Sequence, residues 1–477
     1  MSIQGIGALS RFGVETETVP GTPDGTSPTV YWPITSESVN AGRNTVPSGS
    51  IVGDSMIEAV ADGLISLDGG VQMEFDGSAC GHPIWYWNGN NGYTSGSIAG
   101  AASHSYVTTL PTLAQTTGGS LALGTYFFKV STVLQRTADS KLLIMPASAE
   151  ATITLISPNG TATVAWTNPS PTNVATDLPG HTLYGTLISR TALAGATGTE
   201  YYVGFVSGTT ATYMDDGTSA TESIIVTTQK PYSATIYNHD MIGTPYVSGD
   251  RLKSFTYYGD KNNGEAEQYS YAMMDGMKIA VGGMGEKVML DFTIKATSVN
   301  IVSSFVPSFV PVAPFVGWQA LASIDGSPDT TLENFSIDCS NGVVPVPGMK
   351  MTPFNRGVIS GRRSVSVTFS RQFQDRTFWN RMIAGTPFSL KIQMYGQPIV
   401  SASIYGVTAA QSGLSLDMVP FTYYSVIDIY NLKANKAGAS VSGPDRLVEQ
   451  ITASTWKDAT NLTEMRINMW NTIAAYV

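Results

Sequence analysis

Two stretches of the chain repeat one another and decide how the rest of the sequence is divided. Residues 63–75 read GLISLDGGVQMEF and residues 357–369 read GVISGRRSVSVTF, and the two align without a gap. The aligned apolar pairs are Val71 with Val365, Met73 with Val367, Phe75 with Phe369 and, further along, Trp85 with Trp379. A fixed offset that keeps alternation, spacing and a tryptophan is typical of a duplicated unit. The repeat predicts two copies of one structural unit, with Trp85 and Trp379 at equivalent core positions.

Most of the sequence outside the repeat also has the pattern of strands. Short runs rich in Val, Ile, Thr, Tyr and Phe are separated by Gly, Asn and Pro. One clear alternating run consists of Val288, Leu290, Phe292 and Ile294. Helical spacing is confined to residues 375–384 and to a segment within residues 444–460. We expect a mainly β fold with two tandem β-barrel or β-sandwich units, each with a short helix.

The segment from about residue 105 to residue 230 differs in composition from the two copies around it. It is rich in Thr, Ala and Gly, and strand-like runs occur at residues 124–130, 163–166, 187–191 and 213–217. Trp166 suits the core of a small two-sheet sandwich. The segment resembles fibronectin type III modules, although its Tyr-Phe-Phe-Lys-Val run comes unusually early. The module either starts at a shifted point of the strand cycle or shares only the sandwich architecture.

These patterns divide the chain into four parts. Residues 1–104 and 231–300 form the first unit, and residues 105–230 form a module inserted into one of its connections. Residues 301–430 form the second unit. Residues 431–477 are an extension that completes the unit or contacts neighbouring chains.

The composition indicates a protein that buries surface against partners. Only 13% of the 477 residues are charged, and the formal net charge is −10, whereas roughly 25% is usual for charged residues. The negative charge argues against holding nucleic acid by its phosphates. Cys80 and Cys339 are expected to be reduced and buried. The N-terminus has no secretion signal, and the most apolar stretch, residues 301–316, contains three prolines and is too short to cross a membrane, so we expect a cytoplasmic protein unless a larger assembly carries it out.

No constellation of residues supports catalysis, a cofactor or a metal. Residues 282–287 superficially resemble a phosphate loop, but their spacing favours a hairpin turn. The four histidines, His82, His104, His181 and His239, lack the spacing of a zinc site. Asp-Gly pairs at residues 215–217 and 325–329 leave calcium as an alternative, although turn chemistry explains them first. Residues 85–87, Trp-Tyr-Trp, fit a sugar platform less well than a core position, because Trp85 aligns with Trp379.

Three stretches are informative when they are taken together: residues 13–23, GVETETVPGTP, residues 268–281, QYSYAMMDGMKIAV, and residues 359–378, which start ISGRRSVSV. Together they resemble siphophage major tail tube proteins. The resemblance covers about residues 1–104 and 231–425. It implies a structural virion protein whose sheets curve around a lumen, whose copies close into stacked rings, and through which viral DNA passes without specific binding. It also implies contacts with the tape measure, terminator and distal tail proteins, assembly in the host cytoplasm, and no membrane partner.

The resemblance gives a role to two long loops at matching places in the two copies, residues 40–62 and 340–356. Their apolar residues are candidates for contacts between rings: Ile51, Val52, Met56, Val344, Met349 and Met351. If each copy is one tube unit, three chains make a ring with approximate sixfold symmetry. Six chains per ring is the alternative if the repeat is only strand alternation. A receptor- or carbohydrate-binding virion protein and a tail-associated hydrolase are the competing functions.

Overall fold

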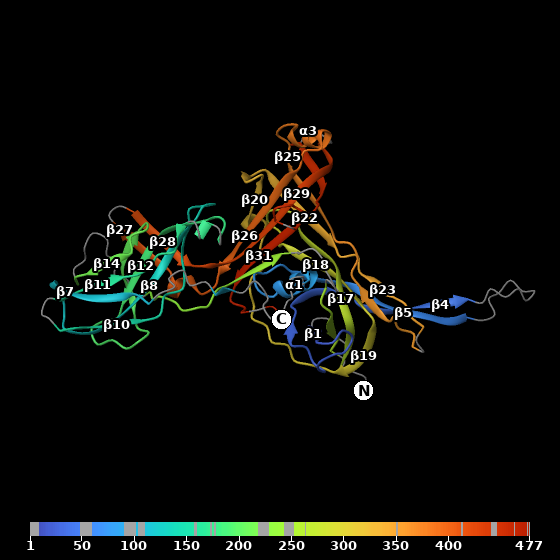
Figure 1. The fold of residues 1–477 in the computed structure, drawn as a ribbon, viewed down its shortest axis with the longest axis horizontal. Helices are drawn as coiled ribbons and strands as arrows, with labels where there is room; N and C mark the ends of the chain where they lie inside the picture. The colour runs from blue at the N-terminus through green and yellow to red at the C-terminus, as the bar shows by residue number, and fades with distance from the viewer. Residues whose placement is uncertain are drawn as a thin grey trace, which may run out of the picture.

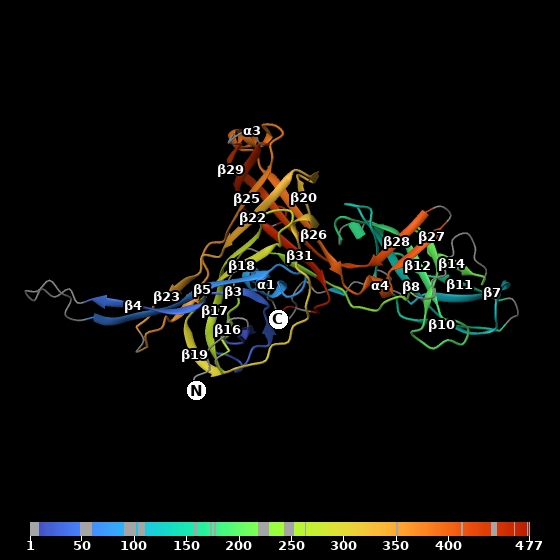
Figure 2. The ribbon, with the colours of Figure 1, turned by 180° about the vertical axis from the view of Figure 1, so that it is seen from behind.

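The computed structural model shows a mainly β protein. It describes residues 9–47, 60–89, 102–103, 110–156, 160–171, 174–175, 178–217, 229–242, 252–262, 264–349, 352–411, 414–439, 446–461, 463–474 and 476. A large central body carries a pair of projecting hairpins on one side and a separate lobe on the other (Figures 1 and 2). The fold class predicted from the sequence is therefore confirmed.

Nineteen strands of the central body join into one hydrogen-bonded network. They are β1 (Arg11–Thr16), β2 (Val30–Tyr31), β3 (Ile34–Glu37), β4 (Asn40–Pro47), β5 (Val60–Glu74), β6 (Ala102–Ser103), β15 (Tyr237–Ile242), β16 (Phe255–Asp260), β17 (Glu265–Val281), β18 (Met289–Ala296), β19 (Ser298–Ser303), β20 (Ala320–Ile324), β21 (Ser327–Asp329), β22 (Leu332–Ser340), β25 (Ser364–Gln372), β26 (Phe388–Pro398), β29 (Thr422–Ala439), β30 (Val448–Ser454) and β31 (Met465–Asn471). Among the described strands no sheet closes into a barrel, so the sandwich alternative applies to the single chain.

Three sheets make up this network. The central sheet has the order β4–β5–β18–β17–β22–β25–β30–β29, with β3 beside β5 at the same edge as β4. The first flanking sheet has the order β2–β1–β16–β17–β19, and the second β21–β20–β26–β29–β31–β15–β6. The long strands β17 and β29 each run from a flanking sheet into the central sheet, which folds the sheets around a common core.

The two halves of this body repeat one arrangement in the same chain order. The first unit has β1, β2, β5, the helix α1 (Gly81–Asn88), β16, β17, β18 and β19. The second unit has β20, β21, β25, the helix α3 (Thr377–Ala384), β26, β29, β30 and β31. Each strand has the same neighbours in both units, and β3 and β22 are also equivalent, because they flank β5 and β25. The topological repeat thus extends well beyond the similar stretches of sequence, and the second unit ends only at β31.

The core between the sheets is formed by the alternating residues that the sequence predicted. Val288, Leu290, Phe292 and Ile294 are at most 2% exposed, and Val365, Val367 and Phe369 at most 3%. Cys80 and Cys339 are free and buried, as predicted. Residues 282–287 form the turn between β17 and β18, again as predicted.

Ten strands form the lobe at the other side, which we call the module (Figure 1). They are β7 (Thr112–Leu121), β8 (Gly124–Arg136), β9 (Leu142–Ile144), β10 (Ala151–Leu155), β11 (Gly160–Ala165), β12 (His181–Arg190), β13 (Tyr201–Ser207), β14 (Thr212–Asp215), β27 (Val407–Gln411) and β28 (Leu414–Pro420). One sheet has the order β13–β12–β8–β9–β28–β27 with β10 beside β8, and the other β14–β11–β7. Phe128 of the first sheet and Val164 of the second pack in one cluster with Trp166. The likeness to fibronectin type III modules stays a prediction.

The structure departs from the sequence-based expectations in two segments. The helix predicted within residues 444–460 is wrong, because Val448–Ser454 is the strand β30 between β25 and β29. Its spacing allowed a helix, but pairing on both sides fixes an extended backbone. The hairpin β27–β28, from the second unit, completes a sheet of the module, which was not predicted. The remaining elements are β23 (Val344–Val346), β24 (Gly357–Ile359), η2 (Gly317–Gln319) and α4 (Ala402–Tyr405).

Candidate assembly surfaces

One face of the central sheet is polar across both units. On β25, for example, Val365, Val367 and Phe369 point into the core, which places Ser366 and Thr368 on the opposite face. The charged residues on this face include Asp68, Glu74, Lys278, Asp291, Lys295, Asp338, Lys433 and Lys436. Acidic and basic side chains are therefore balanced along these strands, and hydroxyl and amide groups lie between them. A hollow of about 590 Å³ lies on this face, between β3 and β22.

The two units of the chain meet where β17 pairs with β22. The pairing is antiparallel, with Met277 opposite Cys339, Lys278 opposite Asp338 and Ile279 opposite Ile337. Lys278 Nζ lies 3.9 Å from Asp338 Oδ1 on the polar face. This junction makes the central sheet continuous from one unit to the next.

The two ends of the central sheet are edges equivalent to the strands of that junction. In the described part of the chain, β3 pairs only with β5, and residues 433–439 of β29 pair only with β30. In the topological repeat β3 corresponds to β22 and β29 to β17. The two edge strands thus correspond to the two strands of the internal junction. In the described part of the chain, each edge strand has one side without a partner strand.

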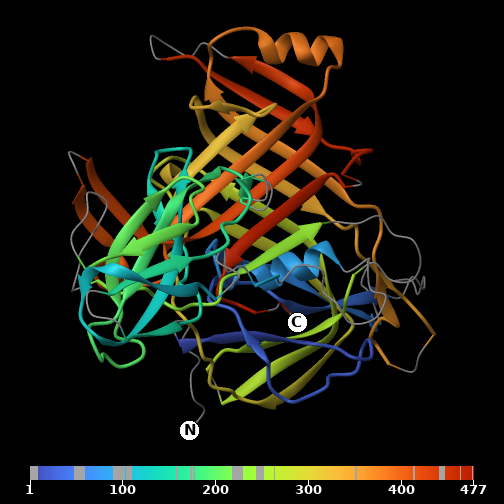
Figure 3. The same cartoon turned by 60° about the vertical axis from the view of Figure 1, so that its left-hand side comes forward.

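Two hairpins extend from the central sheet on the same side of the molecule. β4 pairs with β5, and β23 pairs with β24. They lie side by side, because Ile65 pairs in parallel with Phe354 and its N–H donates to Pro353 O at 2.8 Å. Figure 3 shows the central body from another side, with the hairpins coming off one flank.

Two of the predicted inter-ring residues lie in the described part of the second hairpin and the residues just after β23. Val344 is 54% exposed on β23, and Met349 is fully exposed just beyond it. Ile51, Val52, Met56 and Met351 lie outside the described residues. The hairpins also expose Val46, Val60 and Ile359, which the sequence analysis had not selected. Exposed apolar side chains at this density favour a protein partner.

The two helices occupy equivalent places but differ in their surroundings. All eight residues of α1 are buried, whereas Phe378 alone is buried in α3. Trp85 is 7% exposed and Trp379 47% exposed. The prediction that these tryptophans share a core position is therefore wrong for the single chain. Phe378, one residue earlier, packs against Phe369 and Phe388 and is the core residue of α3.

Residues of the second unit cover both ends of α1. At its C-terminal end Asn341 Nδ2 donates to Trp87 O at 2.9 Å, and the Arg363 guanidinium lies 4.0 Å from the centre of the Trp87 ring. At its N-terminal end Asn471 Nδ2 donates to Gly77 O, and the Tyr476 ring lies 4.7 Å from the His82 ring. A Cβ on Gly81 would lie 1.9 Å from Tyr476 Cζ, so the close approach requires glycine there.

The module is joined to the second unit by strand pairing and by a buried cluster. β28 pairs in parallel with β9, and Phe421 N donates to Ile144 O at 2.9 Å. Leu143 of the module is fully buried in a cluster with Phe421, Tyr424 and Trp470 of the second unit. The module is thus held in a fixed position on the body.

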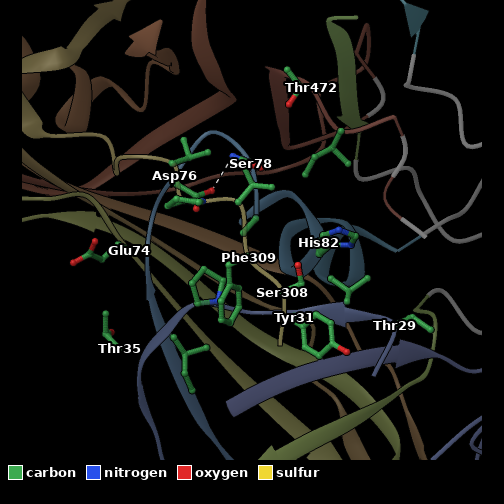
Figure 4. A pocket seen from close by; sticks show the side chains of 18 residues that line it. Thr29, Tyr31, Thr35, Glu74, Asp76, Ser78, His82, Ser308, Phe309 and Thr472 are labelled. Carbon is green, nitrogen blue, oxygen red and sulfur yellow. Dashed lines mark hydrogen bonds between the residues drawn. The ribbon is translucent and has the colours of Figure 1, made fainter. Parts of the chain in front are cut away.

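A hollow of about 820 Å³ lies beneath residues 308–312, which link the two units. Figure 4 shows the side chains that line it, among them Glu74, Asp76 and His82. Asp76 Oδ1 accepts the backbone N–H of Ser78 at 2.8 Å and that of Cys80 at 3.3 Å. Burial raises the pKa of Asp76, and burial with the charge of His239 lowers the pKa of His82 to about 3. Asp76 therefore fixes the start of α1, and His82 stays neutral there, which is a structural use of both groups.

Three of the four carboxylates considered for calcium form ion pairs with arginines. Asp215 lies 2.7 Å from Arg190, and Asp325 lies 2.6 Å from Arg381. Asp329 lies 3.2 Å from Arg371. Among the described residues, no group of three or more His, Cys, Asp or Glu side chains is placed to hold a metal. Trp166, the tryptophan of the module, is buried and donates from Nε1 to Asn168 at 2.7 Å, so its ring is not a platform for sugars.

Comparison with known proteins identifies the family of the chain. The phage tail tube protein family matches residues 7–454, so the chain belongs to this family of structural tail proteins of the virion. No curated protein matches the sequence. In the described part of the chain, no helix has the length and apolar character to cross a membrane.

Proposed function

We propose that this protein is the major tail tube subunit of a long-tailed phage, and that it self-assembles into stacked rings that form the DNA conduit. The observation that carries the proposal is the pair of edges of the central sheet. The edge strand β3 corresponds to β22, and the edge strand β29 corresponds to β17. In the described part of the chain, each edge lacks the partner strand that its counterpart has in the internal β17–β22 junction. An unpaired strand edge is stabilised by pairing with another copy, and a closing rotation makes a ring without free edges.

The internal junction gives the register of the seam between chains. Asp338 lies opposite Ser366 on β25, and Ser36 lies opposite Gln72, the residue that aligns with Ser366. Ser36 therefore takes the place of Asp338. Lys433 takes the place of Lys278. Lys433 lies opposite Ser454 of β30, and Lys278 lies opposite Asp291 of β18, the strand that corresponds to β30. The seam places Lys433 of one chain opposite Ser36 of the next.

Each chain supplies two units, so three chains form a ring of six units. The seam inside each chain forms during folding, which lowers the entropy lost when the ring associates. A ring of six chains would contain twelve units and a much wider opening.

The polar face of the central sheet is the surface that this arrangement turns toward the lumen, because the opposite face is the core. Its hydroxyl groups and balanced charges suit a conduit for DNA. A basic surface would gain affinity for phosphates by counterion release and slow the passage of DNA. The lumen lining is then near-neutral in charge.

The two hairpins supply contacts between successive rings, because both project on the same side of the chain. The partners beyond the tube are the tape measure, terminator and distal tail proteins. Assembly takes place in the host cytoplasm, and the protein ends in the tail of the virion.

Native mass spectrometry of isolated rings and rotational analysis of tube cross-sections by electron microscopy test the proposal. We expect three chains per ring and sixfold-like density around the lumen with three lateral projections. Monomers that never form rings would contradict the proposed function. Rings of six chains would support the tube function but contradict the arrangement of three chains with approximate sixfold symmetry.

A further inference from the structure

Within the described part of the chain, the outer face of α3 carries large apolar side chains that are exposed. Trp379 is 47% exposed and Ile383 is 70% exposed. They lie one turn apart on the helix and therefore on the same side. After the helix the chain passes the Gly385 cap and begins β26 at Phe388.

The equivalent face of α1 is covered, and part of its cover comes from the other unit of the same chain. The end of β31 and the residues after it lie against the start of α1. Asn471 donates to Gly77 O, and Tyr476 Oη donates to Ser78 O at 3.0 Å. Tyr476 is 2% exposed, so it is an inserted side chain and not a surface contact.

The repeat identifies which element stands in the corresponding place at the seam between chains. β19 of the first unit corresponds to β31 of the second, since each pairs with the first half of the long strand, β17 or β29. Within one chain, the second unit lies against α1 of the first unit. In a ring, the first unit of the next chain lies against α3 in the corresponding way. The end of β19 and the residues that follow it must then come close to α3 of the preceding chain.

The segment in question is exposed and apolar in the single chain. Val306 and Val310 are each 79% exposed, Ile301 is 60% exposed and Phe309 is 45% exposed. Tyr476 lies five residues beyond the end of β31, and Phe309 and Val310 lie at a similar distance beyond the end of β19. Both partners of the contact thus offer apolar side chains to water until the ring forms.

We propose that residues 301–310 of one chain dock onto the Trp379 and Ile383 face of α3 in the neighbouring chain. This contact is a second element of the seam, on the outer side of the paired edges β29 and β3. It explains why the α3 helix of the second unit keeps an aromatic side chain at an exposed position.

The inference rests on the proposed ring and is tested by site-specific photo-cross-linking in the assembled protein. The photoreactive residue p-benzoylphenylalanine is placed at Trp379 in an isotopically light chain, and mixed rings are formed with heavy wild-type chains. We expect light–heavy cross-links that map to residues 301–312. The matched control carries the same group at Trp318, which is 66% exposed on the second unit, and is expected to give no cross-link to that segment.

The outcomes of the cross-linking experiment distinguish the docking contact from the proposed function. Rings whose cross-links map elsewhere, or that give none, overturn the docking of residues 301–310 and leave the proposed function standing. Failure of the wild-type protein to form any ring overturns the proposed function and this inference with it. As a second measurement, Trp379→Asp and Val310→Asp should each raise the protein concentration needed for ring formation at least tenfold, whereas Trp318→Asp should change it less than threefold. Equal effects of the three substitutions would contradict the docking.

Discussion

Lys278 of β17 lies directly opposite Asp338 of β22, with Nζ 3.9 Å from Oδ1, at the place where the two units of the chain meet. Both side chains are about half exposed, so the ion pair itself contributes at most about 1 kcal/mol. The ion pair shows which residues of β17 and β22 lie opposite one another at the junction of the two units. The strands on its two sides, β17 and β22, recur as β29 and β3 at the open edges of the same sheet.

The first prediction tests that register between chains. In the variant Ser36→Cys, Lys433→Cys, oxidation of assembled rings should give chains linked by disulfides, because opposite residues of antiparallel strands have Cβ atoms about 5 Å apart. Non-reducing gel electrophoresis should show dimers and trimers of the chain. The native cysteines are buried and contribute little background. The control Ser36→Cys, Lys391→Cys places the second thiol on a flanking-sheet strand, and equally efficient cross-linking there would contradict the seam.

The sequence predicted the fold class and two similar units, because a few aligned positions of the two units carry similar residues. The buried face of β25 and that of β5 keep the same alternation, and α1 and α3 follow them at a similar distance. The other equivalent pairs, such as β19 and β31, have no detectable sequence likeness, since a strand position accepts many apolar residues. The repeat of the outer strands could only be seen in three dimensions.

Other features depend on contacts between distant segments and have no local signal. Trp379 has the sequence context of a core residue, but its burial depends on what covers α3. The hairpin β27–β28 reads as part of the second unit, and its pairing with β9 joins residues far apart in the chain. The local spacing of Leu447, Val448 and Ile451 favoured a helix, and pairing with two neighbouring strands determined β30 instead.

The second prediction concerns the attachment of the module. Leu143→Ala should lower the free energy of unfolding by about 2–5 kcal/mol, because it leaves a cavity among Phe421, Tyr424 and Trp470. Module and second unit should unfold in one calorimetric transition, since they share this cluster. The control Leu123→Ala, at a half-exposed position of the module, should change stability by less than about 0.5 kcal/mol.

A related experiment replaces residues 110–228 with a short Gly/Ser linker. If the module were an independent decoration, the shortened chain would stay soluble and form rings. We expect reduced solubility, because the deletion uncovers Met418 and Phe421, which are fully buried in the whole chain. Soluble rings from the shortened protein would show that the second unit does not need this cover.

The third prediction is a loss of stability in acid that arises from buried histidines. Burial is the main cause that lowers the pKa of His181 to about 4, whereas the unfolded chain has a pKa of about 6.5. The folded protein therefore prefers the neutral ring, and the unfolded chain takes up the proton first. Stability from this residue is fully present above pH 6.5 and is lost as the pH falls from about 6.5 to about 4, by roughly 3 kcal/mol in total.

His181→Phe should remove this part of the pH dependence and keep the aromatic packing against Tyr424 and Phe421. The measurement is the free energy of unfolding in urea at pH 7.5 and at pH 4.5. His82 also has a pKa lowered by burial, to about 3, so the variant should retain a smaller acid slope. An unchanged slope in His181→Phe would show that His181 is not a source of the effect.

The last prediction separates the growth of tubes from the closure of rings. Met56 and Met351 lie outside the described residues, so the substitutions are placed at exposed residues of the two hairpins, Val46 and Met349. In the double variant Val46→Asp, Met349→Asp, a contact between rings would have to bury two carboxylates, and unpaired buried charges are strongly unfavourable. Rings should form at the wild-type concentration, while tube length in electron micrographs should fall to isolated or paired rings. Ile156→Asp, at an 80% exposed position of the module, is the matched control and should leave tube length unchanged. Full-length tubes from the double variant would assign the contact between rings to another surface, whereas the loss of single rings as well would place the hairpins in the seam between chains.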